Sequence, residues 1–433
     1  MQHLYLHIPF CVRRCSYCDF SIAVRKRIPG QEYVETILNE LTRVGSPAAV
    51  PRGKPNHPSG PVGSGMGDGP VGSGMGDGPV GSGTEVDGSF SPGRGPRAPH
   101  PEEISTIYFG GGTPSLLPPE AIARLLSELT SPRRTPHAER EVTIEANPED
   151  VTPDAARAWR AAGVNRVSLG AQSFDDTVLK WMHRSHDAAR IGAAVHALRG
   201  AGIENISLDL IFALPDELQR VWERDLDMAL ALRPNHLSLY GLTVEPRTPL
   251  DRWVSRGATR APNDDRYAEE YLTAHRRLTT ENYQFYEVSN ASLPGFRSRH
   301  NSAYWSGKPY VGLGPAAHSF DGTTRRWNLR AWEAYRRAIA EGRSAVESEE
   351  RLTAEQSALE RIYLGLRTVE GLAYAALGRP SPPPAAAILS PPSLFAAQGW
   401  TFEADGRLKC TPEGWLRLDS IVAELTMHPE TRQ

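Results

Sequence analysis

Cysteine is scarce in this sequence of 433 residues, which contains only four. Three of them crowd into residues 11–18, and the fourth, Cys410, lies near the other end of the chain. This distribution excludes the evenly spread disulfide framework of small secreted proteins. It favours a reducing, cytoplasmic setting, in which Cys410 is a buried or incidental thiol.

Two further absences narrow the class of protein. No apolar run approaches the roughly 20 residues of a membrane-spanning helix, and no signal peptide precedes the first expected strand. The net charge of −3 and the isoelectric point of about 6.5 provide no basic surface for nucleic acid. We therefore expect no nucleic-acid partner and no transmembrane segment, while peripheral contact with a membrane stays open.

One stretch lacks the apolar residues of a folded core. Residues 46–100 consist largely of Gly, Pro and Ser, and the sequence of residues 60–68 recurs at 69–77, with a partial third copy at 78–83. Calcium-binding β-rolls also have nine-residue repeats, but they need many more copies with Asp and aliphatic residues at fixed places. The composition instead predicts a disordered insertion in a surface loop, which costs little stability.

The three clustered cysteines form the strongest motif. Cys11, Cys15 and Cys18 follow a C-x3-C-x2-C pattern, and three thiolates on one loop can bind three irons of a [4Fe–4S] cluster and leave the fourth iron open. An open metal position is typical of a reactive site. The alternative is a structural zinc site, which needs a fourth ligand. No second cysteine pair is present, and His7 lies on an apolar run that predicts a strand.

Outside the insertion, short apolar runs alternate with helical stretches. The runs that predict buried strands are residues 4–8, 104–109, 142–146, 166–169, 206–212 and 237–240, and the helical stretches are residues 32–44, 119–130, 153–162, 187–200 and 218–232. Six such units predict an α/β fold with a parallel sheet and right-handed crossovers.

The C-terminal part of the chain has a different pattern, and the length allows for a second domain. We expect a helix at 264–280 and then irregular, aromatic-rich segments to about residue 340. From about residue 345 helices return, and the expected elements are a helix at 353–366, a proline-rich loop at 380–392, a hairpin at 400–409 and a helix at 415–425.

Polar residues and glycines stand where the expected strands end, which is where proteins built on parallel barrels place their sites. The second strand runs into the sequence Gly-Gly-Gly-Thr-Pro at 110–114, whose backbone can approach a ligand closely or simply form a turn. Later strands lead to Glu145, Gln172, Arg184, Asp209 and Gly241. A carboxylate in an apolar strand needs a partner, which is either a polar group of a ligand or a neighbouring arginine.

The cysteine array, followed one strand later by Gly-Gly-Gly-Thr-Pro, is identified as the signature of the radical S-adenosylmethionine (SAM) superfamily. From Tyr5 to about Trp415, apart from the insertion, the chain resembles the oxygen-independent coproporphyrinogen III oxidase-like group. The resemblance implies a partial (β/α)6 barrel with a small, mainly helical, winged-helix-like C-terminal domain. The expected parts are a barrel core at 1–45 and 101–245, the insertion at 46–100, a barrel extension at 246–340 and the C-terminal domain at 341–433.

The resemblance also implies roles for individual residues. In such proteins SAM chelates the open iron through its amino and carboxylate groups. The residues that match the SAM-binding positions of the family are Gly111, Gly112, Thr113, Glu145, Gln172, Arg184, Asp209 and Gly241. Those that match the positions beside the cluster are Tyr5 and Tyr17.

Three features favour a heme-chaperone branch of this group over its decarboxylating enzymes. Position 20 is Phe, where those enzymes carry a fourth cysteine, and the cluster loop begins by residue 11, without their longer leader. Residues 300–305 match the HNxxYW motif of the chaperone branch. The motif makes His300 a candidate axial ligand of heme iron, with Tyr304 and Trp305 beside the porphyrin. Alternatively, His300 is a loop histidine that hydrogen-bonds its neighbours.

Two functional hypotheses follow. The favoured one is a heme chaperone that binds heme, a [4Fe–4S] cluster and SAM, passes heme to an acceptor protein and does not decarboxylate coproporphyrinogen. The alternative is an oxygen-independent coproporphyrinogen III oxidase, which uses a radical derived from SAM to oxidise propionate side chains. The sequence does not name the acceptor. Ser298 stands where some members place a cysteine, which counts against covalent attachment of heme through a thiol here.

Overall fold

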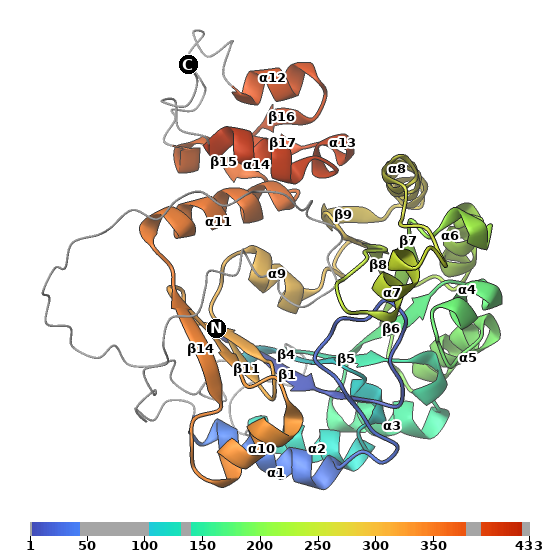
Figure 1. Cartoon of the computed structure of the whole chain (residues 1–433), viewed down its shortest axis with the longest axis vertical. Helices are drawn as coiled ribbons and strands as arrows, with labels where there is room; N and C mark the ends of the chain where they lie inside the picture. The colour runs from blue at the N-terminus through green and yellow to red at the C-terminus, as the bar shows by residue number, and fades with distance from the viewer. Residues whose placement is uncertain (1, 44–103, 131–139, 378–390, 427–433) are drawn as a thin grey trace, which may run out of the picture.

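The computed structural model describes residues 2–43, 104–130, 140–377 and 391–426 (Figure 1). The predicted insertion at 46–100 lies outside these residues, as does most of the proline-rich loop predicted at 380–392. The described chain forms one large mixed sheet with helices packed on it, and a separate group of elements near the C-terminus with its own small sheet.

Six parallel strands form the centre of the large sheet and neighbour one another in chain order. They are β1 (Gln2–Ile8), β4 (Ile104–Gly111), β5 (Glu141–Ala146), β6 (Arg166–Gln172), β7 (Asn205–Phe212) and β8 (His236–Gly241). Each pairs in parallel with the strand before it, as Leu6 of β1 does with Phe109 of β4. This arrangement confirms the predicted parallel α/β core, and the strand order has two ends, as a partial barrel requires.

The sheet continues beyond the six core strands at both edges. Beside β1 it adds β11 (Tyr310–Leu313), β12 (His318–Phe320), β13 (Thr324–Asn328) and β14 (Val346–Arg351); beside β8 it adds β10 (Asn290–Ser292) and β9 (Gln284–Glu287). Only β11 among these runs parallel to its core neighbour. The sequence predicted irregular segments in this part of the chain, which was wrong. Strands of three to six residues are too short to show a clear period.

Helices between the core strands cover the sheet: α1 (Gly30–Leu41), α2 (Pro119–Leu129), α3 (Pro153–Ala162), α5 (Ala188–Gly200) and α6 (Trp222–Ala231). Local signals fix their ends, as in α3, where the Thr152 side chain accepts the N–H of Ala155 and Gly163 ends the helix with a φ of 107°. The helix predicted from residue 218 begins at Trp222, because Gln219 has a left-handed φ of 50°. No helix in the described ranges is long and apolar enough to cross a membrane.

The two faces of the core strands differ in chemistry. Residues such as Leu4, Leu6, Ile107 and Phe109 have no exposed surface and form the apolar core with the helices. Because side chains alternate along a strand, the residues between them lie on the opposite, inner face. That inner face is polar, and its members include His3, Thr106, Thr143, Glu145, Arg166, Ser168, Ser207, Asp209, His236 and Ser238.

The C-terminal elements form a small group beyond α11 (Ala354–Arg367), at the top of Figure 1. Their antiparallel sheet has the order β15-β17-β16, with β15 at Leu372–Ala373. Strands β16 (Thr401–Ala404) and β17 (Arg407–Cys410) confirm the predicted hairpin, and Cys410 is buried as expected. The helix predicted at 415–425 consists of two, α13 (Pro412–Trp415) and α14 (Leu418–Thr426).

Candidate functional site

The three cysteines lie on one loop at the end of β1. Cys11 ends the short strand β2 (Phe10–Cys11), which pairs with β3 (Ala23–Val24), so the loop that carries Cys15 and Cys18 is closed at its base. Backbone hydrogen bonds from Ser16 N–H to Met182 O (3.1 Å) and from Leu250 N–H to Ser16 O (2.8 Å) hold its middle. The sequence therefore builds a loop with a fixed path, which is what a multi-thiolate site needs.

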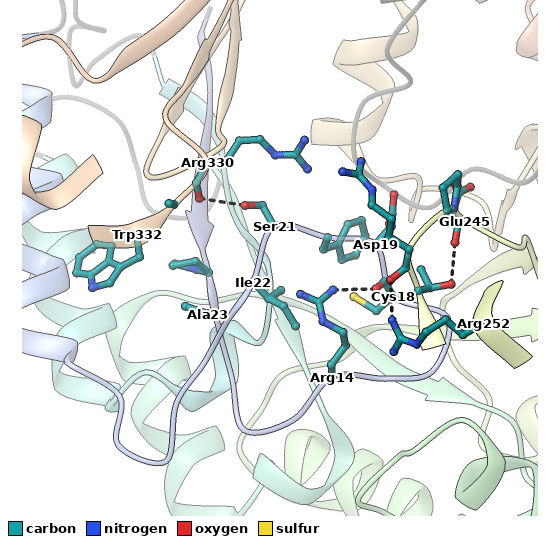
Figure 2. Close-up of a pocket in the computed structure, with 16 residues that line it drawn as sticks. Arg14, Cys18, Asp19, Ser21, Ile22, Ala23, Glu245, Arg252, Arg330 and Trp332 are labelled. Atoms are coloured by element: carbon teal, nitrogen blue, oxygen red, sulfur yellow. Dashed lines mark hydrogen bonds between the residues drawn. The ribbon is translucent and has the colours of Figure 1, made fainter. Parts of the chain in front are cut away.

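The chemistry of this loop fits an iron–sulfur cluster. All three cysteines are free thiols, and the Thr113 hydroxyl lies 3.2 Å from the Cys11 sulfur. Burial raises the pKa of Cys11 to about 11 and that of Cys18 to about 12, so these thiols ionise only when a metal displaces their protons. The Arg14 guanidinium also donates to the carbonyl of Cys18 at 3.0 Å (Figure 2).

A single metal ion fits this site less well. Within the residues that the structure describes, no three His, Cys, Asp or Glu side chains lie close enough together to bind one ion. A structural zinc site requires such a convergence, whereas each thiolate of a cluster binds a different iron. The geometry therefore favours the cluster over the zinc alternative.

Arg184 connects the cysteine loop to the ends of β5 and β6. Its guanidinium donates to Asn147 Oδ1 (2.6 Å), to the carbonyl of Gly170 (3.0 Å) and toward the Cys15 sulfur (3.5 Å). Tyr17 is also a hydrogen-bond partner of this guanidinium. A Cβ atom at Gly170 would meet the Gln172 amide at 2.9 Å and Arg184 Nη2 at 3.1 Å. The structure thus places Cys15, Tyr17, Gln172 and Arg184 close together.

A second group forms around Glu145 on β5. Its carboxylate accepts hydrogen bonds from the Tyr108 hydroxyl (2.9 Å) and from the N–H of Gly111 (3.1 Å). Tyr5 stacks on Tyr108 with ring centroids 6.1 Å apart. Burial raises the pKa of Glu145 to about 7, although the two hydrogen bonds favour the ionised form. Glu145 therefore titrates near neutral pH and is poised to accept a further donor, such as a hydroxyl or ammonium group of a ligand.

The glycines of the 110–114 segment are required by close contacts. A Cβ atom at Gly112 would lie 2.8 Å from the carbonyl oxygen of Phe10, and one at Gly111, whose φ is 111°, would lie 2.7 Å from the His7 ring. Only glycine therefore lets β4 end this close to the cysteine loop. The side chain of Thr113, which follows these glycines, lies beside the thiol of Cys11.

Asp209 lies on the inner face of β7. Its carboxylate accepts hydrogen bonds from Ser168 (2.9 Å) and Ser207 (3.2 Å), and burial raises its pKa above the ordinary value. Gly241 differs from the other predicted residues, because a Cβ atom there would overlap the ring of Tyr267 on helix α8 (Asp264–Thr280). Gly241 therefore packs against an outer helix, and only its backbone is available to a cofactor.

His300 lies in the interior, in the N-terminal half of the barrel, on a helix in a part of the chain where the sequence predicted irregular segments. This helix is α9 (Arg299–Trp305), and Glu141 accepts the backbone N–H groups of Arg299 and His300 at its start, each at 2.9 Å. The imidazole has no exposed surface. Nδ1 lies 2.7 Å from Thr106 Oγ1 and Nε2 lies 2.8 Å from the Tyr304 hydroxyl, so both ring nitrogens have partners.

The rest of the HNxxYW segment reaches toward the C-terminal elements, and α9 lies between the barrel and α11 (Figure 1). The guanidinium of Arg367 on α11 lies 4.1 Å from the ring centroid of Trp305 and pairs with the buried Glu287 at 2.8 Å. The motif therefore connects β4 of the barrel to α11.

Sequence reasoning missed the residues that complete these groups, above all Tyr108, Asn147, Ser168 and Arg166. The signal was available, because polar residues recur with a period of two within the strands, as in Thr106 and Tyr108. Reading the strands only as apolar runs hid the polar inner face. Arg166 is 1% exposed, and its Nε and Nη1 have no hydrogen-bond partner among the described residues.

Comparisons with known proteins agree with this geometry. The model of the radical SAM superfamily matches residues 97–229, and the model of the HemN C-terminal domain matches residues 352–417. A protein of Mycobacterium tuberculosis (strain H37Rv), named heme chaperone HemW, is 33% identical over 422 residues, which are 98% of this chain and 94% of that protein. The chain belongs to the HemW family of radical SAM proteins.

Other HemW proteins show the same relationship. The one from Bacillus subtilis (strain 168) is 29% identical and aligns over 86% of this chain and 85% of its own length. The one from Escherichia coli (strain K12) is 34% identical, with 73% and 69% aligned. Membership of the superfamily implies a [4Fe–4S] cluster and SAM.

The fold also has a solved counterpart. Coproporphyrinogen III oxidase (HemN) from Escherichia coli, a radical SAM enzyme, superimposes with a TM-score of 0.70. The match covers 98% of this chain and 90% of that enzyme at 19% identity, so it shows the common fold alone.

Proposed function

We propose that the chain is a heme chaperone, which binds heme, a [4Fe–4S] cluster and SAM and delivers heme to an acceptor protein. The observation that carries this proposal is the 33% identity to heme chaperone HemW of Mycobacterium tuberculosis over nearly the full length of both proteins. The similarity extends over the barrel and the C-terminal elements, so it does not depend on one motif.

The residues at the C-terminal ends of the core strands are suited to hold the cluster and SAM. Cys11, Cys15 and Cys18 provide three thiolates on one loop, and SAM, when bound, supplies the amino and carboxylate groups for the remaining iron. Glu145 and Asp209 offer hydrogen-bond acceptors on adjoining parts of the polar inner face.

Phe20 supports the chaperone over the oxidase. It lies two residues after Cys18, where the decarboxylating relatives carry a fourth cysteine. The structural likeness to HemN adds no support for the oxidase, because it extends only to the fold.

The role of His300 as an axial ligand stays a prediction. Iron ligation through either nitrogen requires that its hydrogen bond to Thr106 or to Tyr304 break, since each nitrogen has only one lone pair or one proton to offer. A heme that enters at this point would also have to displace α9 from the barrel.

Two assays on one preparation test the function. The full chain, purified without oxygen, is titrated with hemin, and the complex is mixed with an apo-hemoprotein to follow heme transfer. We expect a saturable Soret shift at about one heme per chain, followed by transfer. The proposal would be contradicted if the spectrum of hemin with the chain equals that of hemin in buffer alone, or if the complex does not release heme to the acceptor.

The second assay adds SAM, reductant and coproporphyrinogen III to the same preparation. We expect no decarboxylated porphyrin, because Phe20 stands at the position of the enzymes' fourth cysteine. Protoporphyrinogen formation above that of a Cys15→Ala variant would make the oxidase the better description.

A further inference from the structure

The inner face of the barrel continues past β1 onto strands β11, β12 and β13, which lie beside β1 in the sheet (Figure 1). Tyr310 of β11 pairs with His3 of β1, so it lies on this inner face. Tyr310 pairs in turn with Phe320 of β12, and His318 of β12 pairs with Trp327 of β13. Paired residues lie on one face of a sheet. We call this surface, which consists of Tyr310, His318, Phe320 and Trp327, the aromatic extension.

The aromatic extension is apolar, but it is not sealed inside the core. The ring of Tyr310 lies 6.3 Å from that of Phe320 and 4.6 Å from that of Tyr304 on α9, measured between centroids. Tyr310, His318 and Trp327 are each partly exposed, whereas Phe320 is 8% exposed. The surface therefore consists of rings that a flat, apolar ligand can contact.

The side chain of His318 takes no part in the hydrogen bonds of the fold. Neither of its ring nitrogens forms a hydrogen bond to the described residues, and neither is fully buried. The backbone fixes the hairpin instead, through a bond of 3.0 Å from Asn328 N–H to the carbonyl of Ala317. The imidazole stacks on the ring of Trp327, with centroids 5.8 Å apart and planes inclined by 24°. Stacking thus orients the imidazole and leaves both nitrogens available to a ligand.

Two other histidines of the inner face lack this freedom. His7 and His300 each use both ring nitrogens in hydrogen bonds. Burial lowers the pKa of His318, and the positive charges of Arg325 and Arg330 lower it further. The imidazole of His318 is therefore neutral at neutral pH and offers a lone pair to a metal.

A single free imidazole on an aromatic surface suits the iron of a macrocycle better than a bare metal ion. Among the residues that the structure describes, no three His, Cys, Asp or Glu side chains converge to bind one ion. Heme iron already has four nitrogen ligands from the porphyrin, so one protein nitrogen is enough to hold it. The porphyrin plane stands roughly perpendicular to an imidazole that binds its iron. A heme on His318 would therefore meet the edge of the stacked Trp327 ring, in the edge-to-face arrangement that aromatic groups favour.

We propose that His318 is the axial ligand of the heme iron and that the aromatic extension contacts the porphyrin ring. The inference rests on the proposed function for the identity of the ligand, but it differs from the sequence prediction that His300 binds the iron. Ligation by His318 breaks no hydrogen bond of the described residues and leaves α9 in place.

The test compares hemin with protoporphyrin IX, which has the same ring and carboxylates but no iron. The variants are His318→Ala and His318→Gln, and the matched control is His196→Ala, at an exposed histidine on α5. The full chain, without a histidine tag, is titrated in a buffer free of imidazole. Hemin binding is followed by the Soret band and protoporphyrin binding by fluorescence. Iron and sulfide content and a urea denaturation curve verify each sample.

We expect both His318 variants to bind hemin about tenfold more weakly than the control, and to bind protoporphyrin IX as the wild type does, because only the bond to iron is lost. Added imidazole should restore the Soret spectrum of His318→Ala, since it can occupy the ligand position. His318→Gln decides the matter if His318→Ala is unstable.

Three results would count against the proposal. Hemin affinity and a Soret spectrum equal to those of His196→Ala in both His318 variants would overturn it and leave the chaperone function intact. Equal losses of affinity for hemin and for protoporphyrin IX would show that His318 contacts the ring and does not bind the iron. If the wild type binds no hemin, the proposed function itself fails.

Discussion

The two ends of the barrel both contain polar side chains, but they differ in whether these side chains are available to a cofactor. At one end, which we call the open end, the C-terminal ends of the strands carry the three thiols and the carboxylate of Glu145, and burial raises the pKa of that carboxylate to about 7. At the other end, which we call the closed end, His300 is fully buried and both of its ring nitrogens form short hydrogen bonds. The free thiols and the Glu145 carboxylate make the open end suited to cofactors. The hydrogen bonds of His300 make the closed end suited to holding the chain together.

The largest effect is expected at the open end. Cys15→Ala should remove most of the iron and sulfide from anaerobically purified protein, because two thiolates hold a [4Fe–4S] cluster poorly. The measurement is iron and sulfide content per chain, with the cluster's visible absorption. The matched control is Cys410→Ala, a buried thiol far from the loop, which should keep its full content. A Cys15→Ala protein with about four irons, or a native protein with zinc, would refute the cluster.

The next largest effect is expected at the closed end, where a substitution of His300 distinguishes a heme ligand from a residue that stabilises the fold. His300→Ala should lower the free energy of unfolding of the heme-free chain by about 3 kcal/mol, because it opens a cavity and leaves Thr106 and Tyr304 without partners. The check is a urea denaturation curve beside that of His196→Ala, an exposed histidine on α5. Unchanged stability together with a lost Soret shift would instead identify His300 as the heme ligand.

The sequence predicted the open end far better than the closed end. The cysteine spacing and the Gly-Gly-Gly-Thr-Pro segment depend on local backbone geometry, which the structure reproduces at Cys11, Gly112 and Thr113. The position of His300 depends on β4 and β5, which lie more than a hundred residues earlier in the chain. No local pattern shows that Thr106 and Glu141 will receive α9.

A smaller effect of pH sharpens the account of Glu145. Its folded pKa of about 7 lies above the ordinary value of 4.5, so the native state holds this proton more tightly than the unfolded chain does. Its contribution to stability is fully present below about pH 4.5 and is lost as pH rises through about 7. Glu145→Gln should therefore gain stability relative to the wild type over this window, by on the order of 2 kcal/mol at pH 8.

Denaturation curves at pH 5 and pH 8, without cofactors, measure this difference. Glu128→Gln, at an exposed residue on α2, is the matched control for replacing one carboxylate by an amide. A constant difference between Glu145→Gln and the wild type at both pH values would mean that the folded and unfolded chains do not differ in proton binding at Glu145 between pH 5 and pH 8, and would contradict the raised pKa.

The smallest effect is expected for a segment that belongs to neither end. Residues 55–95 lie within the Gly-, Pro- and Ser-rich sequence between α1 and β4, outside the described residues. Their composition provides almost no apolar surface to bury, so deleting them should change the free energy of unfolding by less than about 1 kcal/mol, the scale of loop-closure entropy. Replacing 55–95 with a Gly–Ser sequence of equal length is the matched control, and iron content is measured in both. A cooperative loss of several kcal/mol in both variants would show that the repeats contribute to the folded core as a third structural unit beside the two ends of the barrel.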